Sequence, residues 1–209
     1  MIRNSTAFII LLVSGMFFLV SCKGAGSDNT GGNKPVTAVE KPNYGGYESQ
    51  VKWGEHLVTV GGCGDCHTPK KMSPQGPVED SSLLFSGHPG QLKAPDFDRK
   101  VLESRGLGLT QTMTAWEGPW GISYAANLTS DQTGIGNWSE DQFIKALREG
   151  KSKGLDNNRM LLPPMPWTSF RNFRDDELKA IFAYLKSTRP IRNLVPPPTP
   201  PLAAAVQKK

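Results

Sequence analysis

Cys63-Gly64-Asp65-Cys66-His67 is the stretch that decides how the rest of the chain is interpreted. Its two thiols lie three positions apart, so both can reach one edge of a porphyrin and form thioether bonds with it. The histidine that follows at once is then held beneath the ring, where its nitrogen can bind iron. Cys-x-x-Cys-His is the pattern of covalent haem attachment. We therefore predict one haem c attached through Cys63 and Cys66, with His67 as the proximal iron ligand.

Three other uses of a Cys-x-x-Cys pair fit the sequence less well. A thioredoxin-like dithiol belongs in a βαβ setting, and the sequence pattern indicates none. A structural zinc site needs two further Cys or His ligands at finger-like spacing, and His56 and His88 are unsuitably placed. A disulfide is the third alternative. If Cys63 and Cys66 bind haem, the remaining cysteine is Cys22, which lies at the end of an apolar leader where lipidation would explain it, so no pair is left for a disulfide.

The composition indicates one soluble domain with tails. The chain has 209 residues, of which 37% are hydrophobic, and its mean hydropathy is −0.38. Its 22 glycines and 17 prolines predict many loops, which suits a core partly filled by a prosthetic group. The formal charge is only +5, and no Lys/Arg run is interleaved with aromatic residues, so we expect no nucleic-acid partner.

Residues 1–21 have the pattern of a secretory signal, with Arg3 followed by an apolar run over residues 7–20. That run is short for a membrane span, which needs about 20 residues. It ends at Leu19-Val20-Ser21-Cys22, which resembles a bacterial lipobox and implies cleavage before a lipidated Cys22. An ordinary signal or an uncleaved anchor, with Cys22 incidental, is the alternative. We expect an exported protein that is lipid-anchored to a bacterial membrane.

Residues 22–46 are rich in Gly, Asn and Ser and contain few apolar side chains. They cannot bury enough surface to fold alone, so we expect a flexible tether. Residue 23 is Lys rather than the Asp that resembles an inner-membrane retention signal in many Gram-negative bacteria. This favours an anchor in the outer membrane with the domain facing the periplasm.

Three helices are predicted within a domain that we place at residues 47–195. Residues 47–61 keep a loose helical spacing and end at two glycines. A capping box that begins at Ser139 starts a second helix, which ends at Gly150. The last helix, residues 175–187, has apolar side chains at i, i+3, i+4 and i+7: Leu178, Ile181, Phe182 and Leu185.

The long section at residues 69–126 is rich in Gly and Pro and irregular in pattern. A loop of this length is unusual in a compact domain unless it is functional or has structure of its own. We expect it to contain short hairpins and to wrap the haem edge. His88, in this section, is a candidate second ligand or propionate partner, although a histidine in a surface turn is the favoured interpretation. His56 is expected to be a partly exposed histidine of the first helix.

Met165 lies in the stiff stretch Pro163-Pro164-Met165-Pro166-Trp167. A methionine in such a loop is not at helical core spacing, which weakens its interpretation as core filler. A thioether binds iron well, and His/Met ligation raises the reduction potential of a haem. We predict Met165 as the distal iron ligand, and the alternatives are Met160, Met113 and Met72.

Together these segments resemble a class I c-type cytochrome, closest to the monohaem electron-transfer domains of bacterial dehydrogenase and oxidase systems. The stretches that carry the resemblance are Trp53-Gly54-Glu55-His56-Leu57-Val58, the attachment motif with Thr68-Pro69, Asn127-Leu128-Thr129, Thr133-Gly134-Ile135-Gly136-Asn137-Trp138-Ser139, the Met165 loop and Asp176-Glu177-Leu178-Lys179-Ala180-Ile181.

The resemblance implies an all-α fold with long loops, in which the first and last helices cross near a contact between a glycine and an aromatic residue. Gly54 would be the glycine, and Phe182 or Tyr184 its neighbour. The separation of His67 from Met165 is longer than in the smallest members, so the insertion is expected to pack outside the haem crevice. Two departures are His56, where an aromatic residue is usual, and Arg174, where a Ser or Thr cap is usual.

The predicted function is one-electron transfer rather than catalysis, because a haem with two axial ligands has no open position for a substrate. We expect redox partner proteins and no small-molecule substrate. One alternative is a cytochrome subunit of a larger dehydrogenase or oxidase complex, and another is a five-coordinate haem sensor or peroxidase. Residues 196–209 are rich in Pro and Ala, and we expect an ordered strap that continues as a disordered tail.

Overall fold

The structure is a computed structural model that describes residues 43–94 and 96–202. The predicted leader, Cys22 and nearly all of the tether lie outside the described residues, as do the last seven residues of the chain. Within the described part, no helix combines the length and the apolar character that a membrane span requires.

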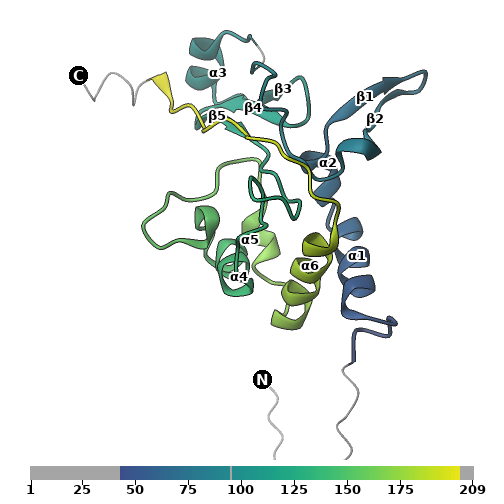
Figure 1. The fold of residues 1–209 in the computed structure, drawn as a ribbon. Helices are drawn as coiled ribbons and strands as arrows, with labels where there is room; N and C mark the ends of the chain where they lie inside the picture. Colours follow the sequence, from purple (N-terminus) through teal and green to yellow (C-terminus); the bar gives the residue numbers. More distant parts are fainter. Residues whose placement is uncertain (1–42, 95, 203–209) are drawn as a thin grey trace, which may run out of the picture. The chain divides into compact units, whose positions relative to one another are not determined.

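The domain is built on the packing of α1 (Gln50–Val60) against α6 (Asp175–Ser187), which lie side by side (Figure 1). Gly54 lies where they cross, because a Cβ atom there would overlap the Ala180 carbonyl oxygen and lie 2.8 Å from the Tyr184 Cβ atom. The predicted close approach at Gly54 is therefore confirmed, with Tyr184 as its aromatic neighbour.

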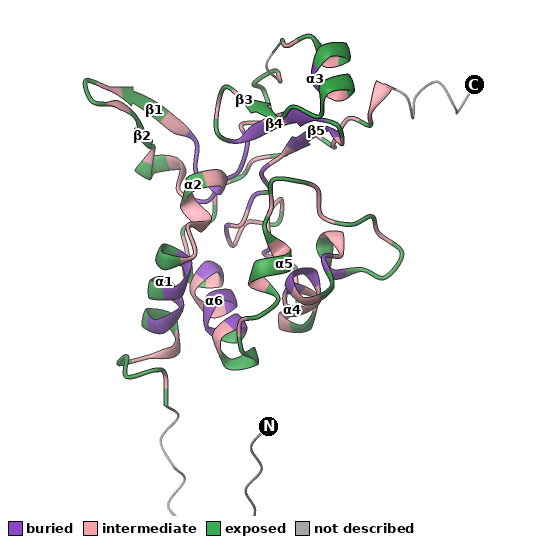
Figure 2. Ribbon diagram, turned by 180° about the vertical axis from the view of Figure 1, so that it is seen from behind, coloured by how far each residue is buried: buried purple, intermediate pink, exposed green. Residues whose placement is uncertain are grey.

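The buried faces of α1 and α6 form the centre of the core, as Figure 2 shows. All four apolar positions predicted for the last helix are buried, and they pack with Trp53, Leu57 and Val58 of α1. The helix begins without a Ser or Thr cap. Instead, the Glu177 carboxylate accepts a hydrogen bond of 2.7 Å from the Arg174 backbone N–H, which satisfies a group at the helix start.

Among the described residues outside 69–126, three further α-helices are present. These are α2 (Cys63–His67), α4 (Glu140–Glu149) and α5 (Trp167–Phe170), and a 3₁₀ turn spans Ser152–Gly154. The capping box predicted before α4 is present, and α4 ends at Gly150 with a φ of 67°. The Phe143 ring of α4 packs on the Phe182 ring of α6 with centroids 5.3 Å apart, which joins α4 to the core.

The expectation of an all-α fold is wrong for residues 69–126, whereas the short hairpins expected there are confirmed, since the section contains two small antiparallel sheets. In one, β1 (Lys70–Ser73) and β2 (Gly76–Glu79) make a hairpin that projects from the body (Figure 1). A 3₁₀ turn follows at Ser81–Leu83. Strands of four residues are too short for their periodicity to be recognised in the sequence.

The second sheet has the order β3-β4-β5. It consists of β3 (Leu109–Thr110), β4 (Ala115–Gly118) and β5 (Gly121–Tyr124). Trp116 of β4 pairs with Ser123 of β5, and Glu117 with Ile122. The preceding helix, α3 (Arg99–Arg105), packs beside β4.

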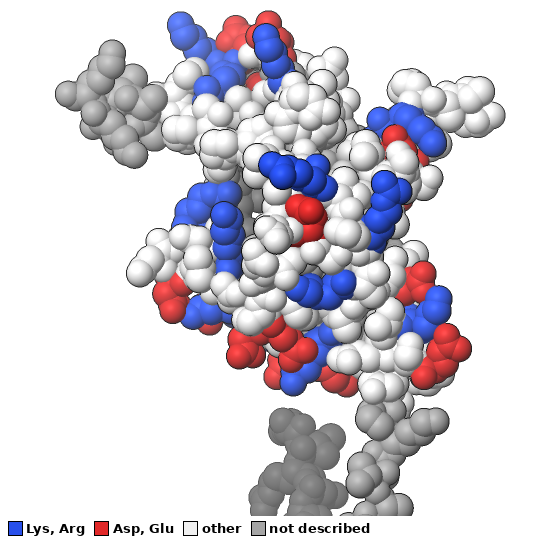
Figure 3. Space-filling view, in the orientation of Figure 1, with Lys and Arg blue, Asp and Glu red and all other residues white. Residues whose placement is uncertain are grey.

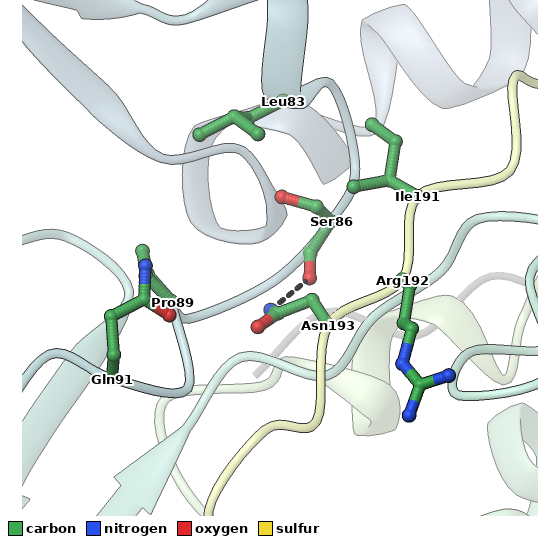
Figure 4. A pocket seen from close by; sticks show the side chains of 7 residues that line it. All are labelled: Leu83, Ser86, Pro89, Gln91, Ile191, Arg192 and Asn193. Atoms are coloured by element: carbon green, nitrogen blue, oxygen red, sulfur yellow. Dashed lines mark hydrogen bonds between the residues drawn. The ribbon is translucent and has the colours of Figure 1, made fainter.

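The chain after α6, residues 189–202, crosses the domain as an extended segment that we call the C-terminal strap. Asn193 ties it to the loop after the β1–β2 hairpin. Its side-chain amide donates to the Ser86 and His88 carbonyl oxygens at 2.7 and 2.8 Å, and its Oδ1 accepts from the Gly90 N–H at 2.9 Å. Figure 4 shows the Asn193 side chain directed at Ser86. The strap predicted near the C-terminus is therefore ordered through residue 202, and it begins before Pro196.

Replacing Asn193 with Ala should lower the free energy of unfolding by about 2 kcal/mol, because three backbone groups lose their partner in a half-buried setting. Arg192 is the matched control, since its side chain points away from Ser86 in Figure 4 and is exposed. We expect Arg192→Ala to change stability by less than about 0.5 kcal/mol. Urea unfolding measures both, and equal effects would show that Asn193 does not tie down the strap.

Candidate haem site

A cavity of about 910 Å³ lies between the helices, β5 and the C-terminal strap. All four residues predicted to hold the haem line it: Cys63, Cys66, His67 and Met165. The first three come from the single turn of α2, whereas Met165 comes from the loop before α5. The fold thus brings the two separated motifs to one cavity.

The His67 imidazole is held in one orientation. Its Nδ1 lies 2.7 Å from the Ala126 carbonyl oxygen, and a carbonyl only accepts, so Nδ1 carries the hydrogen. Nε2 is then the nitrogen with a free electron pair, the state that a metal ligand requires. Burial lowers the pKa of His67 and so favours the neutral ring.

The turn that carries the attachment motif is supported by the start of β1. The Lys70 ammonium donates to the carbonyl oxygens of Gly64, Asp65 and Thr68 at 3.2, 2.8 and 2.7 Å. A cation at a helix C-terminus satisfies carbonyl groups that have no helical partner. The Thr68 hydroxyl in turn accepts from the Phe85 N–H at 3.1 Å. These contacts fix α2 relative to the insertion.

Cys63 and Cys66 are half-buried free thiols. Burial raises the pKa of Cys63 to about 11, and it also raises the pKa of Cys66. Such thiols lack the lowered pKa of a reactive dithiol. Within the described ranges, no group of three or more His, Cys, Asp or Glu side chains is placed so that it could hold a metal ion.

Burial and contact with the cavity distinguish the four candidate methionines. Met165 is half-buried, packs against the hydrophobic core and lines the cavity. Met160, Met113 and Met72 are 41%, 43% and 79% exposed and do not line it. The Met165 loop is held by β5, because the Ser123 hydroxyl donates to the Pro163 carbonyl oxygen at 2.6 Å.

Part of the insertion forms the cavity wall, which agrees with the expectation that this section wraps the haem edge and contradicts the expectation that the insertion packs outside the crevice. Trp116 and Ser123, which pair across β4 and β5, both line the cavity, as do Tyr124, Ala125 and Ala126. The sequence predicts short hairpins in this section but not which residues form their strands, so it did not assign these residues to the cavity wall.

His88 is neither a surface histidine nor part of the cavity wall. Its side chain is fully buried, with Nε2 3.0 Å from the Leu92 carbonyl oxygen and Nδ1 2.9 Å from the Thr114 hydroxyl. Its ring centroid lies 5.0 Å from that of Tyr124. His88 therefore serves packing, which corrects both sequence-based interpretations. His56 is exposed on α1 and stacks on Tyr47, in agreement with the favoured interpretation.

The buried His88 predicts lower stability in acid. Burial lowers its pKa in the folded chain, whereas an unfolded histidine has a pKa of about 6.5. The unfolded chain therefore binds the extra proton, and stability is lost as pH falls below about 6.5, by at most about 1.4 kcal/mol per pH unit. Urea unfolding between pH 5 and 8 should show this slope in His56→Gln and a smaller slope in His88→Gln. Equal slopes would contradict it.

The cavity wall has the chemistry that a haem requires. Apolar side chains of the core, including Leu57, Phe143 and Leu185, form much of it, whereas Lys153 and Arg159 add positive charge from the loop after α4. Cationic groups pair well with carboxylates such as the two propionates of a haem. The donor set of two thiols, an oriented imidazole and a thioether therefore fits haem c.

The charges on one face of the domain are unevenly distributed. Figure 3 shows Lys and Arg side chains spread over the middle of this face, with many Asp and Glu side chains along its lower end and a smaller acidic group at its top. Helix α6 begins at this lower end, and the first turn of α6 contains Asp175, Asp176 and Glu177. The acids stabilise the start of a helix.

Comparison with known proteins shows what kind of domain this is. The chain is 32% identical over 138 residues to the gluconate 2-dehydrogenase cytochrome c subunit of Pantoea cypripedii. It is 33% identical over 138 residues to the alcohol dehydrogenase (quinone) cytochrome c subunit of Gluconobacter oxydans. The chain contains a c-type cytochrome domain. The attachment motif and these relatives together imply haem c as the cofactor of the cytochrome domain.

The relatives are larger proteins than the region they share with this chain. Each of those two matches covers 66% of this chain, but only 23% and 21% of the relative. A subunit of the nicotinate dehydrogenase of Pseudomonas putida is 45% identical over 83 residues, which are 39% of this chain and 7% of that protein. The shared region thus spans less than a quarter of each of these relatives. No family model matches the chain.

Proposed function

We propose that the cytochrome domain is a one-electron carrier with a single covalent haem, and that it serves as the cytochrome subunit of a dehydrogenase complex. The observation that carries the proposal is the meeting of Cys63, Cys66, His67 and Met165 at one cavity. Haem, when bound, supplies an iron that changes its charge by one electron. The protein has to hold it, exclude water and keep its axial positions filled.

Each of these tasks is assigned to residues of this chain. Cys63 and Cys66 form the thioethers, and His67 is the proximal ligand, oriented by the Ala126 carbonyl oxygen. Met165 is the distal ligand, and its loop is stiffened by prolines on both sides. With His67 and Met165 both bound to it, the iron would have no site for a substrate, and the domain itself would not be an enzyme. A His/Met pair also favours a high reduction potential.

The names of the relatives support a dehydrogenase as the electron donor. The gluconate, alcohol and fructose dehydrogenase matches are all named cytochrome subunits; the fructose dehydrogenase protein of Gluconobacter japonicus is 26% identical over 157 residues. This favours a subunit of a dehydrogenase complex over a freely diffusing carrier. The donor would pass single electrons to the haem, and a further redox protein would accept them.

We also propose the domain arrangement and location that the leader indicates. Residues 1–21 act as a lipoprotein signal, Cys22 carries the lipid, and residues 22–46 tether the cytochrome domain of residues 47–195. Several acyl chains on one residue give stable anchoring, because a single chain binds a membrane only marginally. The anchor lies in the outer membrane and the domain faces the periplasm. Cys22→Ser should then shift the protein from the membrane fraction to the soluble fraction.

Carbon monoxide and substrate addition together test the function. The reduced full-length protein should show no spectral change with carbon monoxide, because both axial positions are filled. Native membranes should reduce this haem when gluconate, fructose, ethanol or nicotinate is added, and a gene deletion should remove that signal. A haem that binds carbon monoxide at once would support a sensor or peroxidase instead. Reduction by none of the substrates would contradict the dehydrogenase assignment.

A further inference from the structure

The C-terminal strap is attached to the domain at two places. Asn193 makes the first attachment, through its bonds to the loop at residues 86–90. The second begins at Thr199, which forms an antiparallel bridge with Ile122 of β5. The Ile122 N–H donates to the Thr199 carbonyl oxygen at 2.8 Å, and the Thr199 N–H donates back at 3.0 Å. The strap thus continues the β3-β4-β5 sheet by one bridge.

A pair of charged residues on α3 completes the second attachment. Arg99 and Glu103 form an ion pair of 2.9 Å, and their side chains are only 22% and 13% exposed. Arg99 also donates to the Pro200 carbonyl oxygen at 2.7 Å, and Glu103 accepts from the Leu202 N–H at 2.8 Å. Both members of the pair therefore bind the strap backbone. We call this pair, with its two bonds to the strap, the α3 clip.

Between the two attachments, residues 194–198 line the haem cavity. Their sequence is Leu-Val-Pro-Pro-Pro, and the three prolines have no N–H to donate. Among the described residues, no hydrogen bond joins this span to the rest of the domain. This span is a stiff segment held only at its two ends, because a proline run favours one extended conformation.

We infer that residues 194–198 are a fixed cover over one side of the haem cavity, and that the α3 clip holds this cover closed. Glu103 and Arg99 are then positioning residues that control how much water reaches the haem. The inference rests on the proposed function, since it concerns the same cavity. It adds a role for α3 and the C-terminal strap in setting the reduction potential.

The physical link runs through the solvation of the haem. Oxidation adds a positive charge to the iron, and water stabilises that charge better than an apolar wall does. Opening the cover therefore favours the oxidised form and lowers the reduction potential. Removing a negative charge has the opposite effect, because it disfavours the oxidised form. In a variant without Glu103 the two effects have opposite signs, because removal of the charge alone would raise the potential. A lowered potential would therefore show that the cover has opened.

The test compares full-length, haem-loaded proteins with substitutions at Glu103. Glu103→Ala should lower the reduction potential and increase amide hydrogen exchange at Ile122 and Thr199 by about tenfold, the size expected for losing a hydrogen bond to a charged group. Glu103→Gln removes the charge but keeps an acceptor for the Leu202 N–H, so it should change the exchange less and should not lower the potential. Ser104→Ala is the control, because Ser104 is exposed on α3 and bonds only to Val101 of its own helix.

Thr199→Pro provides a second, charge-neutral test. It removes the N–H that bonds to Ile122 but suits the extended proline run, so it should also lower the potential. Faster exchange at Ile122 with an unchanged or raised potential, in both Glu103→Ala and Thr199→Pro, would show that residues 194–198 do not cover the haem. Unchanged exchange in Glu103→Ala would overturn the clip. A wild-type protein without covalent haem would instead refute the proposed function.

Discussion

Replacing Met165 with Ala is expected to abolish the weak far-red absorption band of a sulfur–iron bond in the oxidised protein. It should also lower the reduction potential by on the order of 100 mV, a fraction of the roughly 0.8 V over which axial ligands tune haem proteins. The reason is that a thioether stabilises the reduced iron. Met165 is the candidate methionine that lines the cavity, and Ser123 and the flanking prolines hold its loop.

Met160 is the matched control for this substitution. It lies in the same segment but is 41% exposed and does not line the cavity. Met160→Ala should keep both the absorption band and the potential. The assignment of Met165 as the distal ligand is wrong if Met165→Ala keeps the band, or if Met160→Ala loses it. A new response to carbon monoxide in Met165→Ala would accompany the predicted loss.

Gly54→Ala is expected to destabilise the domain by about 2 kcal/mol. A methyl group at this position overlaps the Ala180 carbonyl oxygen, which belongs to the backbone of α6 and cannot rotate away. Overpacking of this kind costs about 3 kcal/mol, whereas Ala in place of Gly within a helix returns about 1 kcal/mol. The helices α1 and α6 must therefore separate, and both contribute to the wall of the haem cavity.

Val60→Ala is the comparison on the same helix. Val60 is 64% exposed at the end of α1, so its substitution should change the free energy of unfolding by less than about 0.5 kcal/mol. Urea unfolding of the haem-loaded proteins measures both changes. A Gly54→Ala protein as stable as the wild type would show that the two helices do not cross as closely as the structure has them.

Three of the described helices, α1, α4 and α6, could be predicted from the sequence because their signals are local. The last helix begins and ends at the predicted residues, since acids open it, Pro190 follows it and its apolar spacing is regular. The capping box at Ser139 and the stop at Gly150 are likewise encoded within a few residues. The attachment motif is contiguous, and Met165 is marked by its neighbouring prolines.

The parts that could not be predicted depend on contacts between distant residues. His88 finds its partner in Thr114, and Asn193 finds its partners in the loop at residues 86–90. Nothing near either residue in the sequence indicates these contacts. The strands β3–β5 have two to four residues each, too few for an alternating pattern to stand out. For that reason the sequence did not place Trp116 and Ser123 in the cavity wall.

The most direct test of the haem-binding site is the mass of the full-length protein after expression in a host that matures c-type cytochromes. Denaturation removes a haem that is bound without covalent links, so only thioether-linked haem adds to the mass. We predict a mass increase of one haem for the wild-type chain. The double variant Cys63→Ser with Cys66→Ser should show no increase. A wild-type chain without covalent haem, or a double variant that keeps it, would contradict the assignment of this cavity.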